Sequence, residues 1–517
     1  MLVKVYGAAV SGIDAIVVTI EVSVDRGASY AIVGLPDAAV KESGDRVRSA
    51  LKESGFDNPH RAVLVNMAPA DVRKEGSAYD LPIAIAMLAG TKQLQLPDGQ
   101  YMIMGELGLD GTLRPIRGAL PMAIRARELG YKAFILPQEN AVEAAAVNNL
   151  DVYGASSLRQ VVDLLSEAAP IQPTVIDTRS EFSRNSTAFD MDFADVCGQE
   201  NVKRAFEVAC AGGHNILLVG PPGSGKSMMA KRLPSIMPPM TLHEALETTK
   251  IHSVAGKLRG NTSLMAVRPF RAPHHTISPV ALVGGGSNPK PGEISLAHNG
   301  ILFLDEFPEY PRTVLEVLRQ PLEDRVISIS RARYTVDYPA GFMLVASMNP
   351  CPCGYYNHPT KACTCPPGAV ARYLSRISGP LLDRIDLQVE ILPVPFKDLT
   401  ARSAAETSAD IRARVIAARA IQNERFAAEP DVRCNAQMTS RLIRRWVHLS
   451  TESSAILEKM MTKYDMSARA YDRILKVART IADLEASAEV LPSHIREAAG
   501  YRNLDRSSWG QASHSAI

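Results

Sequence analysis

The sequence has no long apolar run. Its apolar stretches fall short of the ~18 residues that a membrane-spanning helix needs, so we expect no membrane span. Residues 1–18 contain one lysine and an early acid, and no small-residue cleavage site follows a long apolar core. They therefore make an unconvincing signal peptide. Together these absences make a cytoplasmic protein the default expectation.

Net charge is also nearly absent. The 57 Lys and Arg residues against 55 Asp and Glu leave a formal charge of +2, so any surface that binds nucleic acid must be local. A hydrophobic content of 46% and a charged content of 22% are typical of a soluble globular protein. At 517 residues the chain is too long for one core, and we expect about three or four units.

Cysteine is sparse but clustered. Four of the seven cysteines, Cys351, Cys353, Cys363 and Cys365, fall within fifteen residues in the pattern C-x-C, nine residues, C-x-C. This pattern indicates a metal site rather than a disulfide framework. Four thiolates can close a tetrahedral Zn²⁺ site around the polar spacer, with His358 as a spare donor. The alternative is four free thiols without a metal.

Residues 220–227, GPPGSGKS, match the phosphate-loop pattern G-x-x-x-x-G-K-[ST]. An apolar run over residues 215–219 precedes them and good helix formers follow, which is the strand–loop–helix context that the motif needs. We expect Lys226 to reach the β- and γ-phosphates of ATP and Ser227 to hold Mg²⁺. The predicted nucleotide-binding residues are Gly220, Pro221, Pro222, Gly223, Ser224, Gly225, Lys226 and Ser227.

Asp305 and Glu306 follow an apolar strand over residues 301–304. Ligands bind at the carboxyl ends of strands in parallel sheets, so we expect Asp305 to hold Mg²⁺ and Glu306 to polarise the attacking water. Acids are also common at helix N-termini. The complete phosphate loop upstream favours the catalytic interpretation.

Three further residues are assigned by resemblance to AAA+ ATPases. Asn349 ends an apolar strand at the sensor-1 position, and Arg469 starts a lid helix at the sensor-2 position, with Arg473 as its alternative. In the magnesium-chelatase and MCM-type branch, the LLDRID motif supplies Arg384 as an arginine finger to the neighbouring subunit. Arg376 is the second candidate, and a plain surface arginine paired with a neighbouring acid is the alternative. Val196 and Gly198 are candidates for contact with adenine.

Two insertions carry positive charge. Residues 252–292 contain no Asp or Glu but hold Arg268 and Arg271, and three consecutive glycines suit a mobile loop. Residues 325–338 are typical of a β-hairpin with a basic tip, Arg331 and Arg333. Basic loops that line a ring's pore would guide a phosphodiester strand, so these four arginines are candidate DNA contacts. The alternative is a pair of solvated loops.

Residues 1–167 resemble the proteolytic domain of the Lon family. The resemblance lies in residues 73–80 and in residues 105–118 with the helix and strand that follow. The positions that match the catalytic serine and lysine hold Ala78 and Leu120, so we expect the fold without the protease. A shifted Ser77–Lys74 dyad is the alternative.

The predicted fold class is α/β, in the order Lon-protease-like α/β domain (1–167), linker (168–190), P-loop AAA+ parallel-sheet core (191–395), all-helical C-terminal lid (396–500) and frayed tail (501–517). Nearly the whole chain resembles the ComM/YifB family of bacterial magnesium-chelatase-like AAA+ ATPases. The resemblance rests on residues 33–37, 74–80, 270–275, 291–298, 349–354 and 379–386.

This resemblance implies a hexameric DNA helicase that acts on single-stranded or branched DNA and promotes branch migration during natural transformation. A remodelling chaperone for a protein partner and a metal-chelatase ATPase subunit are the alternatives. The second is disfavoured because such subunits generally lack the Lon-like domain and the cysteine cluster. An active Lon-like protease is opposed by Ala78 and Leu120.

Overall fold

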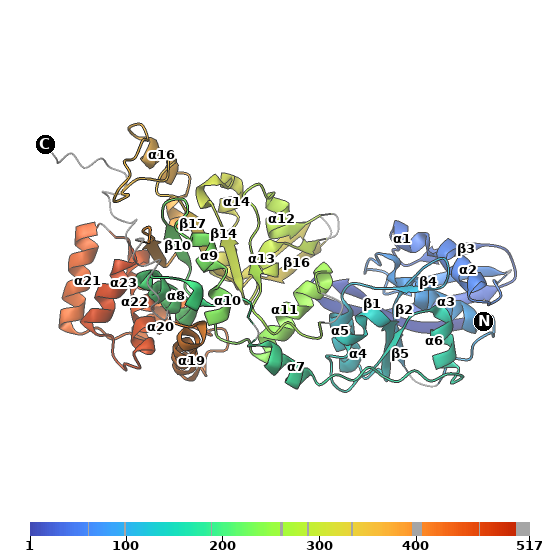
Figure 1. Ribbon diagram of the computed structural model, residues 1–517. Helices are drawn as coiled ribbons and strands as arrows, with labels where there is room; N and C mark the ends of the chain where they lie inside the picture. The colour runs from blue at the N-terminus through green and yellow to red at the C-terminus, as the bar shows by residue number, and fades with distance from the viewer. Residues whose placement is uncertain are drawn as a thin grey trace.

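A computed structural model describes residues 1–502 except 60, 98–99, 188, 259–261, 287–288, 332–333, 395–405 and 465. The chain forms a row of three units, with the N-terminal unit at one end, a parallel sheet in the middle and a group of helices at the other end (Figure 1). A search of these residues finds no helix long and apolar enough to cross a membrane.

The N-terminal unit is built on a seven-stranded mixed sheet, with the order β3-β4-β2-β1-β5-β8-β9. Its first two strands pair antiparallel from Leu2↔Ser23 to Ser11↔Asp14, and buried residues recur along them, as a sheet with one covered face requires. The strands of the sheet are β1 (Leu2–Ser11), β2 (Asp14–Asp25), β3 (Tyr30–Val33), β4 (Ala62–Ala68), β5 (Tyr101–Ile103), β8 (Ala133–Pro137) and β9 (Asp151–Ala155).

Helix α3 (Asp80–Gly90) is buried along its whole length because its sequence is apolar on every side after the first residue. It packs on β1 and β2. The remaining helices of this unit are α1 (Ala38–Lys41), α2 (Ser43–Glu53), α4 (Ala119–Glu128), α5 (Gln138–Ala144) and α6 (Leu158–Leu165), and a small pair joins β6 (Glu106–Leu107) to β7 (Leu113–Arg114).

The alternative Ser77–Lys74 dyad is not assembled in the structure. The Ser77 hydroxyl donates to the Glu106 carboxylate, whereas the Lys74 amine donates to the backbone carbonyl of Pro69. The two side chains therefore have different hydrogen-bond partners.

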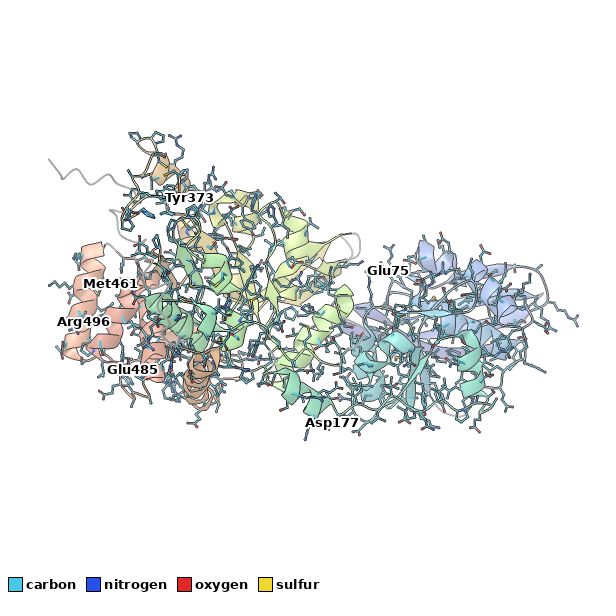
Figure 2. All side chains as sticks on the ribbon, viewed as in Figure 1. Glu75, Asp177, Tyr373, Met461, Glu485 and Arg496 are labelled. Carbon is cyan, nitrogen blue, oxygen red and sulfur yellow. The ribbon has the colours of Figure 1, made fainter. Side chains whose placement is uncertain are left out.

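A helix interrupts the predicted linker. Helix α7 (Thr178–Asn185) is capped by Asp177, whose side chain accepts a hydrogen bond from the Ser180 N–H. Asp177 is labelled near the junction of the units in Figure 2. Because this helix buries few side chains, its sequence has no apolar periodicity. The capping residue Asp177 is the signal in the sequence that could have predicted the helix.

The central unit is a five-stranded parallel sheet in the order β11-β14-β17-β10-β18. Its strands are β11 (Phe270–Arg271), β14 (Ile301–Leu304), β17 (Met343–Met348), β10 (Ile216–Val219) and β18 (Leu387–Glu390). The three middle strands are buried at every residue, since helices cover both faces. The helices are α8 (Glu200–Gly212), α9 (Lys226–Ala230), α10 (Leu233–Ile236), α11 (Leu242–Ala255), α12 (Pro279–Val283), α13 (Glu293–Leu296), α14 (Arg312–Glu316), α15 (Pro321–Asp324), α16 (Ala369–Leu374) and α17 (Gly379–Leu382).

The hairpin predicted over residues 325–338 is present as β15 (Val326–Arg331) and β16 (Tyr334–Pro339), paired from Val326↔Pro339 to Arg331↔Tyr334. Residues 332–333 at its tip, and with them Arg333, lie outside the described residues. The predicted mobile insert of residues 252–292 is not one loop. It starts inside α11, supplies the edge strand β11, and forms the pair β12 (Gly284–Gly285) with β13 (Lys290–Pro291).

The described residues from 406 to 500 form helices and no named strand. Two of these helices pack on α8, so the helical unit and the parallel sheet share one apolar core. The helices are α19 (Ser408–Arg425), α20 (Ser440–Trp446), α21 (Thr451–Tyr464), α22 (Ala468–Leu484) and α23 (Pro492–Gly500).

Candidate nucleotide site

The phosphate loop joins β10 to α9 at the carboxyl ends of the parallel strands. Gly223 and Gly225 have φ angles of 78° and 84°, a region that favours glycine and lets the chain turn tightly before the helix. The Gly220 N–H donates to the carbonyl of Met348 at 3.1 Å, which ties the loop to the end of β17.

Lys226 lies inside this loop. Its amine donates to the carbonyls of Gly220 at 2.7 Å and Pro221 at 2.9 Å, and to Asn349 Oδ1 at 3.3 Å. Burial lowers the pKa of the amine, and the nearby acids Asp305 and Glu306 oppose that shift. The predicted phosphate-loop lysine and the predicted sensor asparagine are therefore direct neighbours.

Asp305 is held between two hydroxyls. The Ser227 hydroxyl donates to Asp305 Oδ2 at 2.6 Å, and the Ser347 hydroxyl donates to Oδ1. Hydroxyl and carboxylate oxygens are the ligand types that Mg²⁺ prefers, so the two predicted magnesium residues fit the ion. The contribution of Ser347 escaped the sequence-based prediction, although a serine in an otherwise apolar strand is a signal for it.

Glu306 has an unexpected partner from the basic insert. Its backbone is in the left-handed region at φ 53°, its side chain is 57% exposed, and His275 Nδ1 lies 3.2 Å from its carboxylate. The His274 and His275 rings are 4.0 Å apart, and the Tyr310 hydroxyl anchors this loop by donating to the Pro273 carbonyl at 2.6 Å. The insert thus contacts the predicted catalytic acid directly.

Arg384 lies at the opposite edge of the sheet. It precedes β18 by three residues, and its carbonyl accepts from the side chain of Asn215, the residue before β10. Because β10 and β18 are parallel, this edge holds the amino ends of the strands, whereas the phosphate loop follows their carboxyl ends. Arg384 donates to the Pro380 carbonyl at 2.7 Å, pairs with Glu323, and lines a surface cavity.

The two sensor-2 candidates lie beside Arg384. Arg469 is 63% exposed and 3.9 Å from the carboxylate of Asp383, whereas Arg473 pairs with buried Asp386. Burial alone would raise the pKa of Asp386, but Arg473 and His214 hold it well below its usual range. Arg473 is therefore committed to an internal pair, and Arg469 is the more available of the two.

Arg376 is the second candidate for the finger. It pairs with Glu309 at 2.8 Å and reaches the carbonyl of Pro308, both of which follow the acidic pair closely in the chain. It lies on the side of the sheet where β14 ends, away from Arg384.

The four clustered cysteines converge on one point. Their sulfur atoms all lie within 4.8 Å of one another, with Cys351 at 3.3 Å from Cys353 and 3.8 Å from Cys363. Zn–S bonds of about 2.3 Å in a tetrahedron place sulfurs about 3.8 Å apart. The Tyr356 N–H also donates to Cys351 Sγ at 3.3 Å, so the donor set fits a metal ion.

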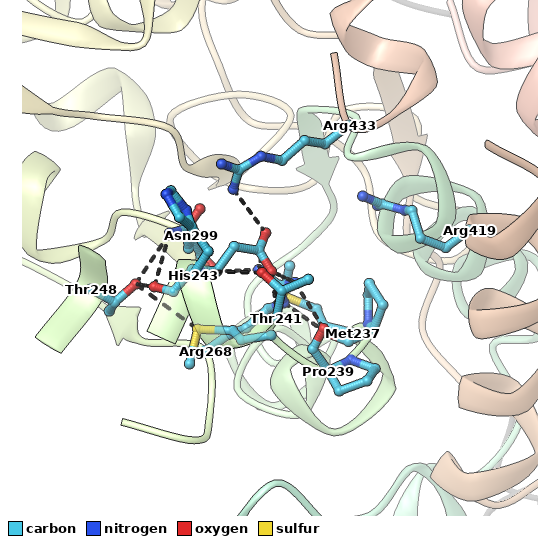
Figure 3. A network of polar contacts seen from close by, with 12 residues as sticks. Met237, Pro239, Thr241, His243, Thr248, Arg268, Asn299, Arg419 and Arg433 are labelled. Carbon is cyan, nitrogen blue, oxygen red and sulfur yellow. Dashed lines mark hydrogen bonds and ion pairs between the residues drawn. The ribbon is translucent and has the colours of Figure 1, made fainter. Parts of the chain in front are cut away.

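Two of the predicted DNA contacts pair with acids of the same chain. Arg268 donates to the carbonyls of Pro238 and Asn299, each at 2.7 Å, and pairs with Glu244. Figure 3 shows Arg268 within this network of polar contacts. Arg271 forms a two-bond ion pair with Glu293 at 2.6 and 2.7 Å. Both guanidinium groups thus have acidic partners in the same chain, and their contact with DNA stays a prediction.

A parallel sheet with a phosphate loop and an acidic pair at its carboxyl edge defines a P-loop nucleotide-binding protein of the AAA+ type. Three family models match the chain: magnesium chelatase subunit ChlI over residues 192–399, subunit ChlI of Mg-chelatase over 20–140, and the ChlI C-terminal model over 405–502.

Curated relatives cover nearly the full length. Competence protein ComM of Haemophilus influenzae is 44% identical over 98% of both chains, and YifB of Escherichia coli K12 is 42% identical over 97% of both. The DNA replication licensing factor Mcm6 of Anopheles gambiae is 21% identical over 86% of this chain and 53% of its own. The chain belongs to the ComM/YifB family of magnesium-chelatase-like proteins.

Proposed function

We propose that this chain is a ring-forming ATPase that couples ATP hydrolysis to movement along DNA. More specifically, we propose that it is a helicase that promotes branch migration during natural transformation. The proposal of a ring rests on one observation: the residues expected to act on ATP are divided between the two edges of one sheet. Lys226, Ser227 and Asp305 lie at the carboxyl edge, whereas Arg384 and Arg469 lie at the amino edge.

The separation is too large for one chain to close. Strand β10 has four residues, which span about 13 Å. A second copy must therefore bring its arginine edge to the phosphate loop of the first. Arg384 suits this use because it lines an open cavity, and its partner Glu323 is exposed enough to release it. Repeating this contact head to tail closes a ring when the rotation between neighbours divides a full turn, and this closed arrangement is the one we propose.

Each group has a chemical task in the shared site. Asp305 and Ser227 would hold Mg²⁺, which neutralises charge on the phosphates, and Lys226 with Asn349 would orient the terminal phosphate. Glu306 would polarise the attacking water. Arg384 from the neighbour would stabilise the charge that develops in the transition state, where such a residue is worth ~10³–10⁵ in rate.

The DNA part of the proposal rests on the hairpin and on the relatives. Strand β15 ends at Arg331, and the hairpin of β15 and β16 precedes β17 in the chain; Arg333 lies outside the described residues. ComM is named as a competence protein and Mcm6 as a DNA replication licensing factor. The engagement of Arg268 and Arg271 inside the protein leaves the hairpin as the stronger candidate DNA contact.

We also propose Zn²⁺ as the metal of the cysteine cluster. Four thiolate donors at tetrahedral spacing favour zinc, and closed four-sulfur sites are structural sites in other proteins.

The function is tested by ATP turnover and branch migration on a four-way DNA junction. We expect single-stranded or branched DNA to raise ATP turnover, and we expect branch migration to separate the junction into two duplexes only when ATP is present. Lys226→Ala abolishes both activities, whereas Lys231→Ala, an exposed lysine next to the same helix, retains them. Turnover that responds to an unfolded protein substrate but not to DNA would favour the remodelling chaperone instead.

A further inference from the structure

The cysteine loop, defined as residues 351–365, begins where the nucleotide site ends. Asn349 accepts a hydrogen bond from Lys226, and the buried Cys351 follows two residues later. The residue before Asn349 is bonded through its carbonyl to Gly220, the first residue of the phosphate loop. One short piece of backbone therefore connects the thiols to the phosphate loop.

The cysteine loop also packs on the phosphate loop directly. Gly354 has a φ angle of 84°, and a Cβ atom placed there would lie 2.5 Å and 2.9 Å from two ring carbons of Pro222. Real Cβ atoms do not approach other atoms so closely, so only a glycine lets the two loops meet in this way. The backbone of one loop forms a wall against the other.

A third contact closes the arrangement from the far side. Tyr373 lies buried on α16 just after the cysteine loop, and the backbone of Asn349 lies close enough to its hydroxyl to oppose the rise in its pKa that burial causes. Figure 2 places Tyr373 on the lobe above the parallel sheet. A small pocket between the two loops is lined by Gly220 and Pro221 on one side and by Tyr356 and His358 on the other.

The cysteine loop has little else to fix its shape. Residues 351–365 contain no helix or strand, and only Cys351 and Gly354 among them are buried. A loop of this size cannot bury enough apolar surface to fold by itself, and metal–thiolate bonds supply that free energy in small metal-binding units. The position of Gly354 against Pro222 thus depends on the four sulfurs being held together.

We propose that a Zn²⁺ ion bound by Cys351, Cys353, Cys363 and Cys365 fixes one wall of the nucleotide site, so that tight ATP binding requires the metal-loaded loop. This inference rests on the zinc proposed above and is independent of movement along DNA.

The test compares metal content and ATP affinity in four variants of the full chain. Cys363→Ser with Cys365→Ser removes two partly exposed ligands, and Gly354→Ala keeps all four ligands but places a Cβ against Pro222. Ala362→Ser changes an exposed neighbour of the ligands. Gly368→Ala controls for backbone strain, because Gly368 has a φ angle of 77° and no atom lies within 4 Å of the added Cβ.

Zinc is measured by mass spectrometry, and affinity is measured with a fluorescent ATP analogue and Mg²⁺ without DNA. We expect one zinc per wild-type chain. The double cysteine variant loses the zinc and binds ATP at least about tenfold more weakly. Gly354→Ala keeps the zinc but also binds ATP more weakly, while Ala362→Ser and Gly368→Ala behave as wild type.

Two results would overturn the proposal. A double cysteine variant that lacks zinc but binds ATP as tightly as wild type would show that the metal does not support the nucleotide site. A wild-type chain that takes up no zinc even after anaerobic reconstitution would remove the metal itself. Loss of DNA stimulation with normal zinc content and ATP affinity would count against the proposed motor and leave this inference intact.

Discussion

Substitution of Arg384 by alanine tests whether this arginine is structural or catalytic, because the two roles predict losses of ATP turnover of very different size. In the described chain Arg384 makes one hydrogen bond to a carbonyl and one ion pair with Glu323, whose side chain is 62% exposed. The Arg384 side chain is only 10% exposed, but the Glu323 carboxylate that the substitution leaves behind is open to water, so no buried charge is left unpaired. A hydrogen bond contributes about 0.5–1.5 kcal/mol and such an ion pair about 1 kcal/mol. These two contacts therefore account for a loss of up to about 2.5 kcal/mol of folding free energy.

The expected loss of catalysis is much larger. If Arg384 acts on the neighbour's nucleotide, hydrolysis falls by ~10³–10⁵, whereas ATP affinity changes little because the phosphate loop of the same chain is intact. Steady-state turnover and equilibrium ATP binding are measured on one preparation, with thermal unfolding to check the fold. Glu323→Gln is the matched control, since it breaks the same pair but keeps the arginine, and its turnover stays within a few-fold of wild type.

A turnover for Arg384→Ala within about tenfold of wild type would refute the assignment, because the loss would then be no larger than its structural contacts explain. Hydrolysis and ATP affinity that fall in proportion would also contradict it, since a residue from the neighbour acts after binding.

Glu306→Gln keeps the shape of the site but removes the carboxylate, so we expect ATP binding near wild type with turnover reduced ~10²–10⁴, measured by phosphate release; near-normal turnover would end its proposed role. Arg268→Ala removes the closer of two arginines that face the buried Glu244 and leaves Arg433 at 3.4 Å, so we expect a loss of up to about 3–5 kcal/mol in unfolding free energy by denaturant titration. A stable variant with weakened DNA binding would restore Arg268 as a DNA contact. Arg331→Ala with Arg333→Ala should weaken DNA binding and flatten its dependence on log salt by up to ~0.7 per lost phosphate contact on a single strand; unchanged affinity would remove the hairpin from the DNA path.

Local patterns predicted which residues of the candidate nucleotide site lie close together, because its parts follow strands. The phosphate loop fixes Lys226 and Ser227 by spacing alone, and an apolar run that ends in Asp305 or Asn349 places each side chain at the carboxyl edge of a parallel sheet. The hairpin predicted over residues 325–338 forms at residues 326–339, since apolar residues alternate along both of its strands. These features depend on short segments whose geometry the chain itself determines.

Features that depend on contacts between distant segments were not predicted. The pairing of His275 with Glu306 joins residues on two loops, and the packing of Gly354 on Pro222 joins two turns. Counting charge along the sequence also missed the acidic partner of Arg268, because Glu244 lies upstream of the acid-free stretch. Charge counted along a chain does not show which guanidinium groups are neutralised in the fold.

The shared site between neighbouring subunits is tested most directly by mixing two inactive variants. Lys226→Ala lacks a working phosphate loop but keeps Arg384, and Arg384→Ala has the reverse defect. When differently tagged copies of the two co-purify as mixed assemblies, random assortment makes about a quarter of the interfaces complete. We expect each variant alone to be inactive and the mixture to recover ATP turnover, with a maximum near equal amounts. Mixed assemblies that show no turnover at any ratio would contradict the account.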